Sequence, residues 1–124
     1  MDNQPIKFKL AVATSDGIVV NQHFGRAQSF RIYAVTQDSK ITFLEERNFE
    51  PLCQSGSHDE SQLEKRIAAI TDCKYILVSR IGQGASEALQ SQGIFPIEMP
   101  GFINESIEKL MKYNTKQNEH TQLA

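Results

Sequence analysis

The chain has 124 residues, of which 40% are hydrophobic and 23% charged, as in ordinary globular domains and unlike disordered or fibrous chains. Thirteen Lys and Arg against fifteen Asp and Glu give a net charge of -2, which excludes a general electrostatic attraction for nucleic acid or anionic membranes. The apolar runs are only strand-sized and the start, MDNQPIKFK, lacks the apolar stretch of a signal peptide, so we expect a cytoplasmic protein without a membrane segment.

The first part of the chain predicts three strands. Residues 7–14 (KFKLAVAT) alternate and then become continuously apolar, which is typical of a central strand. A turn should follow at Ser15-Asp16-Gly17, where glycine supplies a positive φ. Residues 29–36 (SFRIYAVT) and 40–49 (KITFLEERNF) then indicate two antiparallel neighbours.

The second part has the period of helices alternating with short strands. A capping box at Ser57 and Glu60 precedes the stripe Leu63, Ile67 and Ile70, which favours a helix. The expected elements are a helix over 59–71, a buried strand over 75–79, a helix over 86–92 capped by Gly93, a short strand over 94–98 and an amphipathic helix over 103–111.

This order of elements predicts an α/β fold with a ribonuclease-H-like mixed five-stranded sheet flanked by about three helices. No internal repeat or linker divides the chain, so we expect a single domain over residues 1–113. Residues 114–124 (NTKQNEHTQLA) offer nothing to bury, and we expect them to form a disordered tail.

The loop NQHFGR, residues 21–26, concentrates polar groups between two strands, where side chains reach solvent. The imidazole of His23 could bind iron or molybdenum through one nitrogen, and Arg26 could offset the charge of an anionic cluster, while Phe24 anchors the loop. The alternative is that His23 only forms a hydrogen bond within a turn and Gly25 only supplies the bend.

The loop CQSGSH, residues 53–58, places a thiol and an imidazole together, which suits a soft metal or an iron–sulfur cluster. Its spacing does not match a closed zinc site, which needs four ligands. Cys53 could equally be a half-buried thiol, and His58 a solvent-facing side chain near a helix start. Cys73 lies beside an apolar strand, and we expect it in the core.

The segment SRIGQG, residues 79–84, leaves a strand and enters a helix, where backbone N–H groups can hold an anion. It lacks the Gly-Lys-Ser/Thr ending of a P-loop, and Gly82 and Gly84 alone make a weak dinucleotide motif. A plain strand-to-helix turn is the alternative. Because ligands bind at the carboxyl ends of parallel strands, Arg80 could face the same cleft as His23.

A metal-dependent nuclease is one possible function, because a ribonuclease-H-like layout can carry carboxylates that bind divalent metals. The carboxylates are poorly placed for this. Asp16 lies in a turn, Glu45 and Glu46 should point to opposite faces, and Asp72 lies at a helix end. The sequence has no Gly-x-Ser-x-Gly motif, which would indicate a hydrolase of the Ser/His/Asp type.

Five segments together resemble the dinitrogenase iron-molybdenum cofactor biosynthesis family, which includes NifX, the core of NafY and the C-terminal domain of NifB. They are AVATSDG, NQHFGRAQSFRIYAV, the Cys53 loop, SRIGQGASEAL and QGIFPIE, spread from about residue 7 to residue 113. The resemblance implies a ribonuclease-H-like fold without nuclease chemistry. The Cys-x-x-x-Cys-x-x-Cys motif of the radical chemistry of NifB is absent from this sequence.

The resemblance further implies a non-catalytic carrier of an iron–sulfur cluster, the iron-molybdenum cofactor or its precursor. The implied partners are cofactor-assembly proteins (NifB-like, or a NifEN-like scaffold) or apo-dinitrogenase. The residues that match the family pattern are His23 as cluster ligand, Asn21, Gln22 and Arg26 around it, Arg80 and Gly82 in the Arg-Ile-Gly turn, and Cys53 and His58 as further metal ligands. A protein-interaction or regulatory module without metal remains the alternative.

Overall fold

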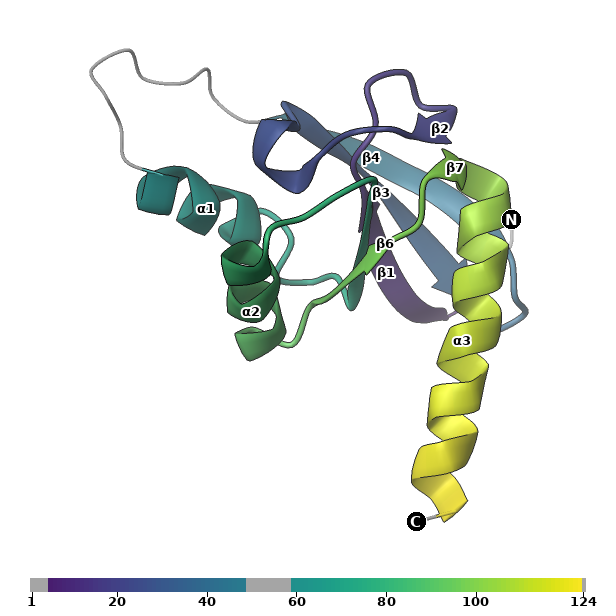
Figure 1. The fold of residues 1–124 in the computed structure, drawn as a ribbon. Helices are drawn as coiled ribbons and strands as arrows, with labels where there is room; N and C mark the ends of the chain where they lie inside the picture. The colour runs from purple at the N-terminus through teal and green to yellow at the C-terminus, as the bar shows by residue number, and fades with distance from the viewer. Residues whose placement is uncertain (1–4, 49–58, 124) are drawn as a thin grey trace.

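The computed structural model describes residues 5–48 and 59–123. Figure 1 shows strands in the middle of the molecule with helices on either side. The strands are β1 (Ile6–Val12), β2 (Val19–Val20), β3 (Ser29–Thr36), β4 (Ile41–Asn48), β5 (Tyr75–Val78), β6 (Phe95–Glu98) and β7 (Gly101–Phe102). The helices are the short 3-10 helix η1 (Phe24–Arg26), α1 (Asp59–Ala68), α2 (Gln83–Ser91) and α3 (Ile103–Leu123).

The main sheet has five strands in the order β4-β3-β1-β5-β6. Strand β1 is central, antiparallel to β3 and parallel to β5. Strand β4 extends the antiparallel half and β6 extends the parallel half. The predicted fold class is therefore confirmed: an α/β, ribonuclease-H-like mixed sheet with three α-helices in the described part of the chain.

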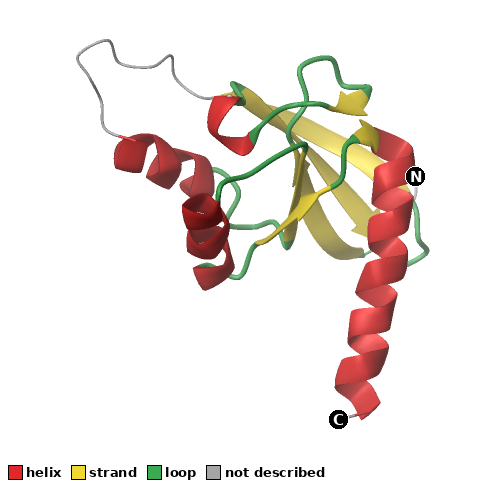
Figure 2. Cartoon of the chain, in the orientation of Figure 1, coloured by secondary structure: helices red, strands yellow, loops and turns green. Residues whose placement is uncertain are grey.

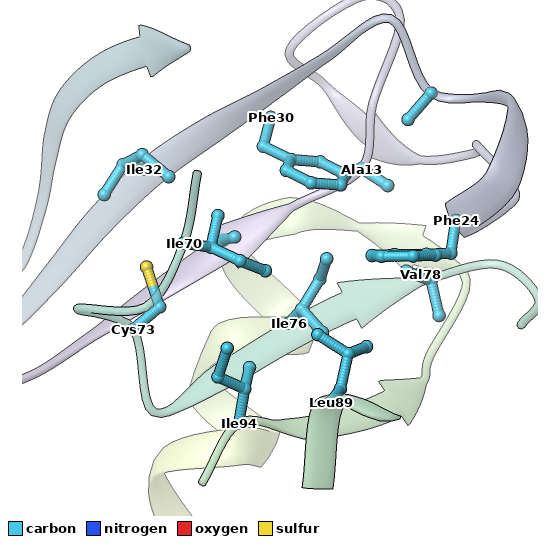
Figure 3. Close-up of a cluster of buried hydrophobic side chains, with 12 residues drawn as sticks. Ala13, Phe24, Phe30, Ile32, Ile70, Cys73, Ile76, Val78, Leu89 and Ile94 are labelled. Atoms are coloured by element: carbon cyan, nitrogen blue, oxygen red, sulfur yellow. The ribbon is translucent and has the colours of Figure 1, made fainter. Parts of the chain in front are cut away.

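The sheet separates two hydrophobic cores. Figure 2 shows α1 and α2 on one face and α3 on the other. Because side chains alternate along a strand, β1 and the residue after it send Ala11 and Ala13 toward α1 and α2, while Leu10 and Val12 belong to the core under α3. Figure 3 shows the first core, in which Cys73 is only 3% exposed, as the sequence predicted.

Several element boundaries differ from the prediction. Helix α2 begins at Gln83 instead of residue 86, and Gly82 is the residue that precedes it. The helix therefore includes Gly84, although glycine has a low helix propensity. Helix α1 ends at Ala68, and a turn follows it. The small sheet of β2 and β7 was not expected, since two-residue strands leave no periodic signal. Gly17 and Gly93 have positive φ, as expected.

Helix α3 runs to Leu123, whereas the sequence analysis ended the domain at residue 113 and expected a disordered tail over 114–124. Asn114, the first residue of the expected tail, lies within this helix and is buried, at 1% exposure. Its Oδ1 accepts hydrogen bonds from the Tyr75 hydroxyl at 2.7 Å and from Lys74 Nζ at 2.8 Å. Across residues 5–48 and 59–123, no helix combines the length and the apolar character needed to cross a membrane.

Candidate functional site

The His23 loop extends the sheet at the carboxyl ends of β1 and β5. The Gln22 amide donates to the Ala13 carbonyl at 3.3 Å, and the Ser79 amide donates to the Gln22 carbonyl at 3.0 Å. The Phe24 amide then donates to the Arg80 carbonyl at 2.9 Å. These bonds make His23 and Arg80 partners in a parallel β-bridge, so two residues far apart in sequence lie side by side.

Phe24 anchors this loop, as the sequence predicted. Its side chain is only 2% exposed, and its ring stacks on Phe30 with a centroid distance of 5.7 Å. The amides of Arg26 and Ala27 both donate to the His23 carbonyl at 3.1 Å, which closes the 3-10 turn. With the main chain held in this way, His23 itself is exposed and its imidazole is available to solvent.

Arg66 connects helix α1 to the same turn. This arginine is only 7% exposed, and its Nη2 donates to the Ala27 carbonyl at 2.9 Å. Burial lowers the pKa of the Arg66 guanidinium below its ordinary value. Since Ala27 directly follows the 3-10 helix, Arg66 fixes the turn from the protein interior and leaves its outer side open.

A shallow pocket of about 530 Å³ lies on that outer side. It is lined by His23, Gly25, Arg26, Arg80, Ile81 and Gly82. The structure therefore brings together four residues that the sequence analysis named as site residues, two from the His23 loop and two from the turn after β5. We refer to this hollow as the His23 pocket.

The second wall of the His23 pocket is the start of helix α2. Gly82 is the residue before the helix, and no side chain caps the amides of the first turn. The Ile81 amide donates to Glu98 Oε2 at 3.0 Å, which holds the turn against strand β6. A helix start of this kind favours negative charge in its vicinity.

Two guanidinium groups give the His23 pocket its charge. Arg26 and Arg80 are both exposed, and neither forms a side-chain hydrogen bond or ion pair with any residue in the described ranges. Together with an imidazole that can bind a metal, this arrangement can hold an anionic guest that contains metal. Such a guest would meet at most one metal ligand among the pocket residues, so it would be held weakly.

Gln22 and Arg26 also line a second pocket, of about 440 Å³, on the other side of the loop. Its walls are almost entirely polar. Apart from Gln22 and Arg26, the lining residues were not predicted as binding residues: Thr14, Ser15, Gln28, Ser29, Glu46 and Asn48. Ser29 donates to Glu46 Oε2 at 2.8 Å within it. The only hint in the sequence is the pair Thr14-Ser15 at the end of a predicted strand.

Asn21, also named as a site residue, lines neither pocket. Its Oδ1 accepts from the Ser15 amide at 2.9 Å, and its Nδ2 donates to the Ser15 hydroxyl at 3.0 Å. The Asn21 side chain therefore closes the loop formed by residues 15–21, which is a structural role.

Cys53 and His58 lie outside the residues that the structure describes. The other cysteine, Cys73, is buried, and burial together with the nearby carboxylate of Asp72 raises the pKa of its thiol to about 12. A thiol with so high a pKa is neutral at physiological pH and is a poor metal ligand.

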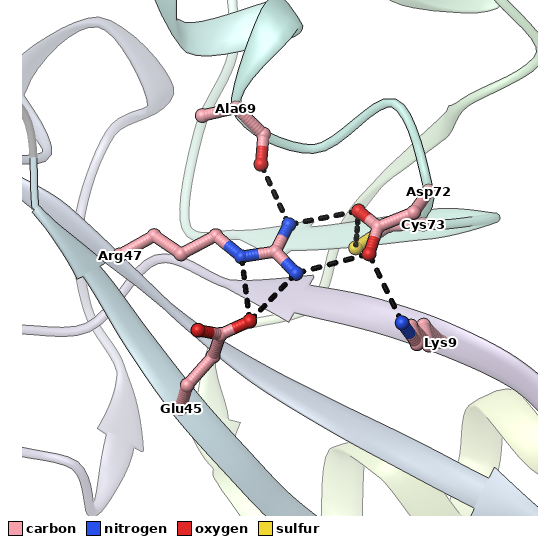
Figure 4. Close-up of polar contacts among 6 residues, drawn as sticks. All are labelled: Lys9, Glu45, Arg47, Ala69, Asp72 and Cys73. Atoms are coloured by element: carbon pink, nitrogen blue, oxygen red, sulfur yellow. Dashed lines mark hydrogen bonds and ion pairs between the residues drawn. The ribbon is translucent and has the colours of Figure 1, made fainter.

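The carboxylates considered for a nuclease are engaged elsewhere. Asp16 Oδ1 accepts from the amides of Ile18 and Val19, and these bonds lower the pKa of Asp16. Glu45 and Asp72 both accept hydrogen bonds from Arg47 (Figure 4), and neither lines the His23 pocket. Within residues 5–48 and 59–123, no group of three His, Cys, Asp or Glu side chains could hold a metal ion.

Comparisons with known proteins point to one family. A family model described as dinitrogenase iron-molybdenum cofactor matches residues 7–113. The FeMo cofactor biosynthesis protein NifB of Herbaspirillum seropedicae is 34% identical over 96% of this chain, which spans 24% of that protein. Protein NifX of Sinorhizobium fredii is 30% identical, and the match covers 84% of this chain and 68% of NifX.

A solved structure supports the fold. The crystal structure of the protein PH0822 superimposes with a TM-score of 0.55 and covers 84% of this chain and 90% of its own. At 23% sequence identity this likeness concerns the fold alone. The overall arrangement of helices and strands is therefore shared with a solved structure.

Proposed function

The chain belongs to the dinitrogenase iron-molybdenum cofactor family, and from this premise we propose that it binds and hands on a metal–sulfur precursor of that cofactor, or the cofactor itself, without catalysing a reaction. The family match supports a role in cofactor biosynthesis. The NifB relative is about four times as long as the matched region, so the activity of that whole protein is not transferred to this chain.

The observation that carries the proposal is the meeting of His23, Arg26 and Arg80 at one shallow pocket. A cluster of iron and sulfide with a net negative charge needs a metal ligand and positive charge around its sulfides. The imidazole of His23 supplies the ligand. The two guanidinium groups, which have no carboxylate partner among the described residues, supply the charge.

Weak attachment suits this role. Four thiolate ligands would hold a cluster for a long time, whereas one imidazole and a few hydrogen bonds allow release to an acceptor. We propose that the donor and acceptor are cofactor-assembly proteins or apo-dinitrogenase, in the cytoplasm. Cys53 and His58 are proposed as additional ligands that strengthen binding without being required for it.

Anaerobic titration of the protein with isolated iron-molybdenum cofactor, followed by visible absorption, tests the proposal. We expect saturable uptake by the wild-type protein and its loss in His23→Ala. Arg26→Ala and Arg80→Ala should each weaken uptake about tenfold, because each removes one charge-assisted contact. Lys112→Ala, an exposed residue of α3 away from the pocket, removes the same charge and serves as the matched control.

Two results would contradict the proposal. The first is the absence of uptake by the wild-type protein. The second is undiminished uptake by His23→Ala with Cys53→Ala, because the cluster would then bind elsewhere. A partner protein captured equally well by wild type and this double variant without any cofactor would instead favour the interaction module.

A further inference from the structure

Two kinds of glycine occur in this fold. Gly17 and Gly93 have φ values of 74° and 81°, a region that other residues rarely adopt, so the fold requires glycine there. Gly25 and Gly82 have no such φ, and a Cβ added at either position meets no atom within 4 Å. The fold therefore does not require glycine at residues 25 and 82.

Gly84 also has open space and an ordinary φ, but it does not line the His23 pocket. Gly25 and Gly82 both line it, one on each wall. A Cβ at either of these two positions would therefore meet no protein atom and would add bulk to a residue that lines the pocket. Glycine at a position where the backbone allows alanine also gives the unfolded chain more freedom, which disfavours folding.

We propose that Gly25 and Gly82 set the closest approach of the guest, and that the pocket takes a bulky, rigid polyanion lying directly against the main chain of both walls. A small ion held by His23 alone would not need this clearance. The inference rests on the proposed function and adds to it the size of the guest and the two residues that select for size.

The physical reason is that the repulsion between two atoms rises steeply once they are closer than van der Waals contact. A rigid guest that touches two opposite walls cannot move away from an added methyl group without losing contact with the other wall. Hydrogen bonds from the main chain and the two guanidinium groups would lengthen at the same time. Even one added carbon should therefore weaken binding.

The test compares Gly25→Ala and Gly82→Ser with Gly84→Ala, using isolated iron-molybdenum cofactor as the probe under anaerobic conditions. We expect the first two variants to bind at least about tenfold more weakly than wild type. Their melting temperatures should equal or exceed that of wild type, because alanine restricts the unfolded chain and serine can cap helix α2. Gly84→Ala should bind like wild type and melt at a higher temperature.

A second measurement tests whether the glycine variants weaken binding through their added bulk or by displacing the imidazole of His23. Carbethoxylation of His23 by diethyl pyrocarbonate, followed by mass spectrometry of its peptide, should proceed at the wild-type rate in Gly25→Ala and Gly82→Ser. A slower rate would mean that the loop has moved and would contradict the inference.

The outcomes also separate this inference from the proposed function. Failure of wild type to bind the cofactor contradicts the proposed function. If wild type binds and the two pocket variants bind equally well, the proposed function stands and the inference is wrong. A lower melting temperature in Gly25→Ala or Gly82→Ser, or weaker binding in Gly84→Ala, would also contradict the inference.

Discussion

Three arginines of this protein lie in two regions that differ in how their charge is matched. Arg47 donates to both carboxylate oxygens of Asp72, at 2.8 and 2.9 Å, to Glu45 Oε2 at 2.8 Å and to the Ala69 carbonyl at 2.7 Å (Figure 4). Arg26 and Arg80 at the His23 pocket have no such partners in the described part of the chain. The same side chain stabilises the fold in one region and is available to a guest in the other.

This pairing shifts the pKa values of both groups in the first region. The Arg47 guanidinium holds the pKa of Asp72 well below its usual range, and Asp72 in turn raises the pKa of Arg47. Lys9 adds a further ion pair with Asp72 at 3.2 Å. Charges that are matched inside the protein do not attract an outside anion, whereas unmatched ones do.

The largest effect on stability should come from Phe24, the one part of the pocket loop that is buried. Phe24→Ala removes a ring that stacks on Phe30, and we expect the free energy of unfolding to fall by about 3 kcal/mol. Phe43→Ala is the control, because the Phe43 ring is 45% exposed and its loss should cost about 1 kcal/mol. Urea denaturation followed by circular dichroism measures both, and equal losses would show that Phe24 does not anchor the loop.

A smaller effect tests the contrast between the arginines directly. Arg47→Met removes the donor that two carboxylates and a carbonyl share, leaves Asp72 with Lys9 as its remaining cation, and should lower the free energy of unfolding by about 2 kcal/mol. Arg26→Met and Arg80→Met should change it by less than about 0.5 kcal/mol, since these side chains are exposed and unpaired within the described ranges. The same urea experiment applies. A loss of similar size in all three variants would remove the distinction between the two regions.

The smallest effect concerns pH. The folded-state pKa of Asp72 is lowered, so its contribution is present above the ordinary carboxyl pKa of 3.8 and is lost as the pH falls through the folded value. Because Asp72 is 39% exposed, solvent screens the pair, and we expect Asp72→Asn to cost about 1 kcal/mol. The difference between wild type and variant should be constant from pH 5 to about pH 8 and shrink below about pH 4.

Thermal unfolding at a series of pH values measures this difference, with Asp38→Asn as control. Asp38 is also a carboxylate with a lowered pKa, caused mainly by the Thr36 hydroxyl, but it lies in an exposed turn. A stability difference for Asp72→Asn that persists unchanged at pH 2 would show that the ion pair is not its source.

Much of the fold could be predicted because hydrophobic period is a local property. Alternation in residues 7–14 identified the central strand, and the stripe of Leu63, Ile67 and Ile70 identified helix α1. The pair β2–β7 escaped prediction, because two residues are too few to show a period. The end of helix α3 was misplaced because the burial of Asn114 depends on Tyr75, the first residue of β5, and on Lys74 just before it.

The residue types of the candidate site could be predicted from the sequence, but the role of each residue could not. A histidine, two arginines and glycines in strand connections were evident from the sequence, and the structure places five of them around one pocket. Asn21 looked equivalent to its neighbours, yet its side chain bonds to Ser15. Gly25 looked like a residue needed for a bend, yet its φ is ordinary. Side-chain partners and backbone angles are not encoded in composition.

By itself, the sequence determined the α/β class, the burial of Cys73 and the presence of a polar loop around His23, because each depends on residues close together in the chain. Only the tertiary structure decided that His23 lies beside Arg80, that Arg47 is paired with Asp72, and that Arg26 and Arg80 line the same pocket. Strand order sets these distances, and strand order follows from how the whole chain packs its two cores around the sheet.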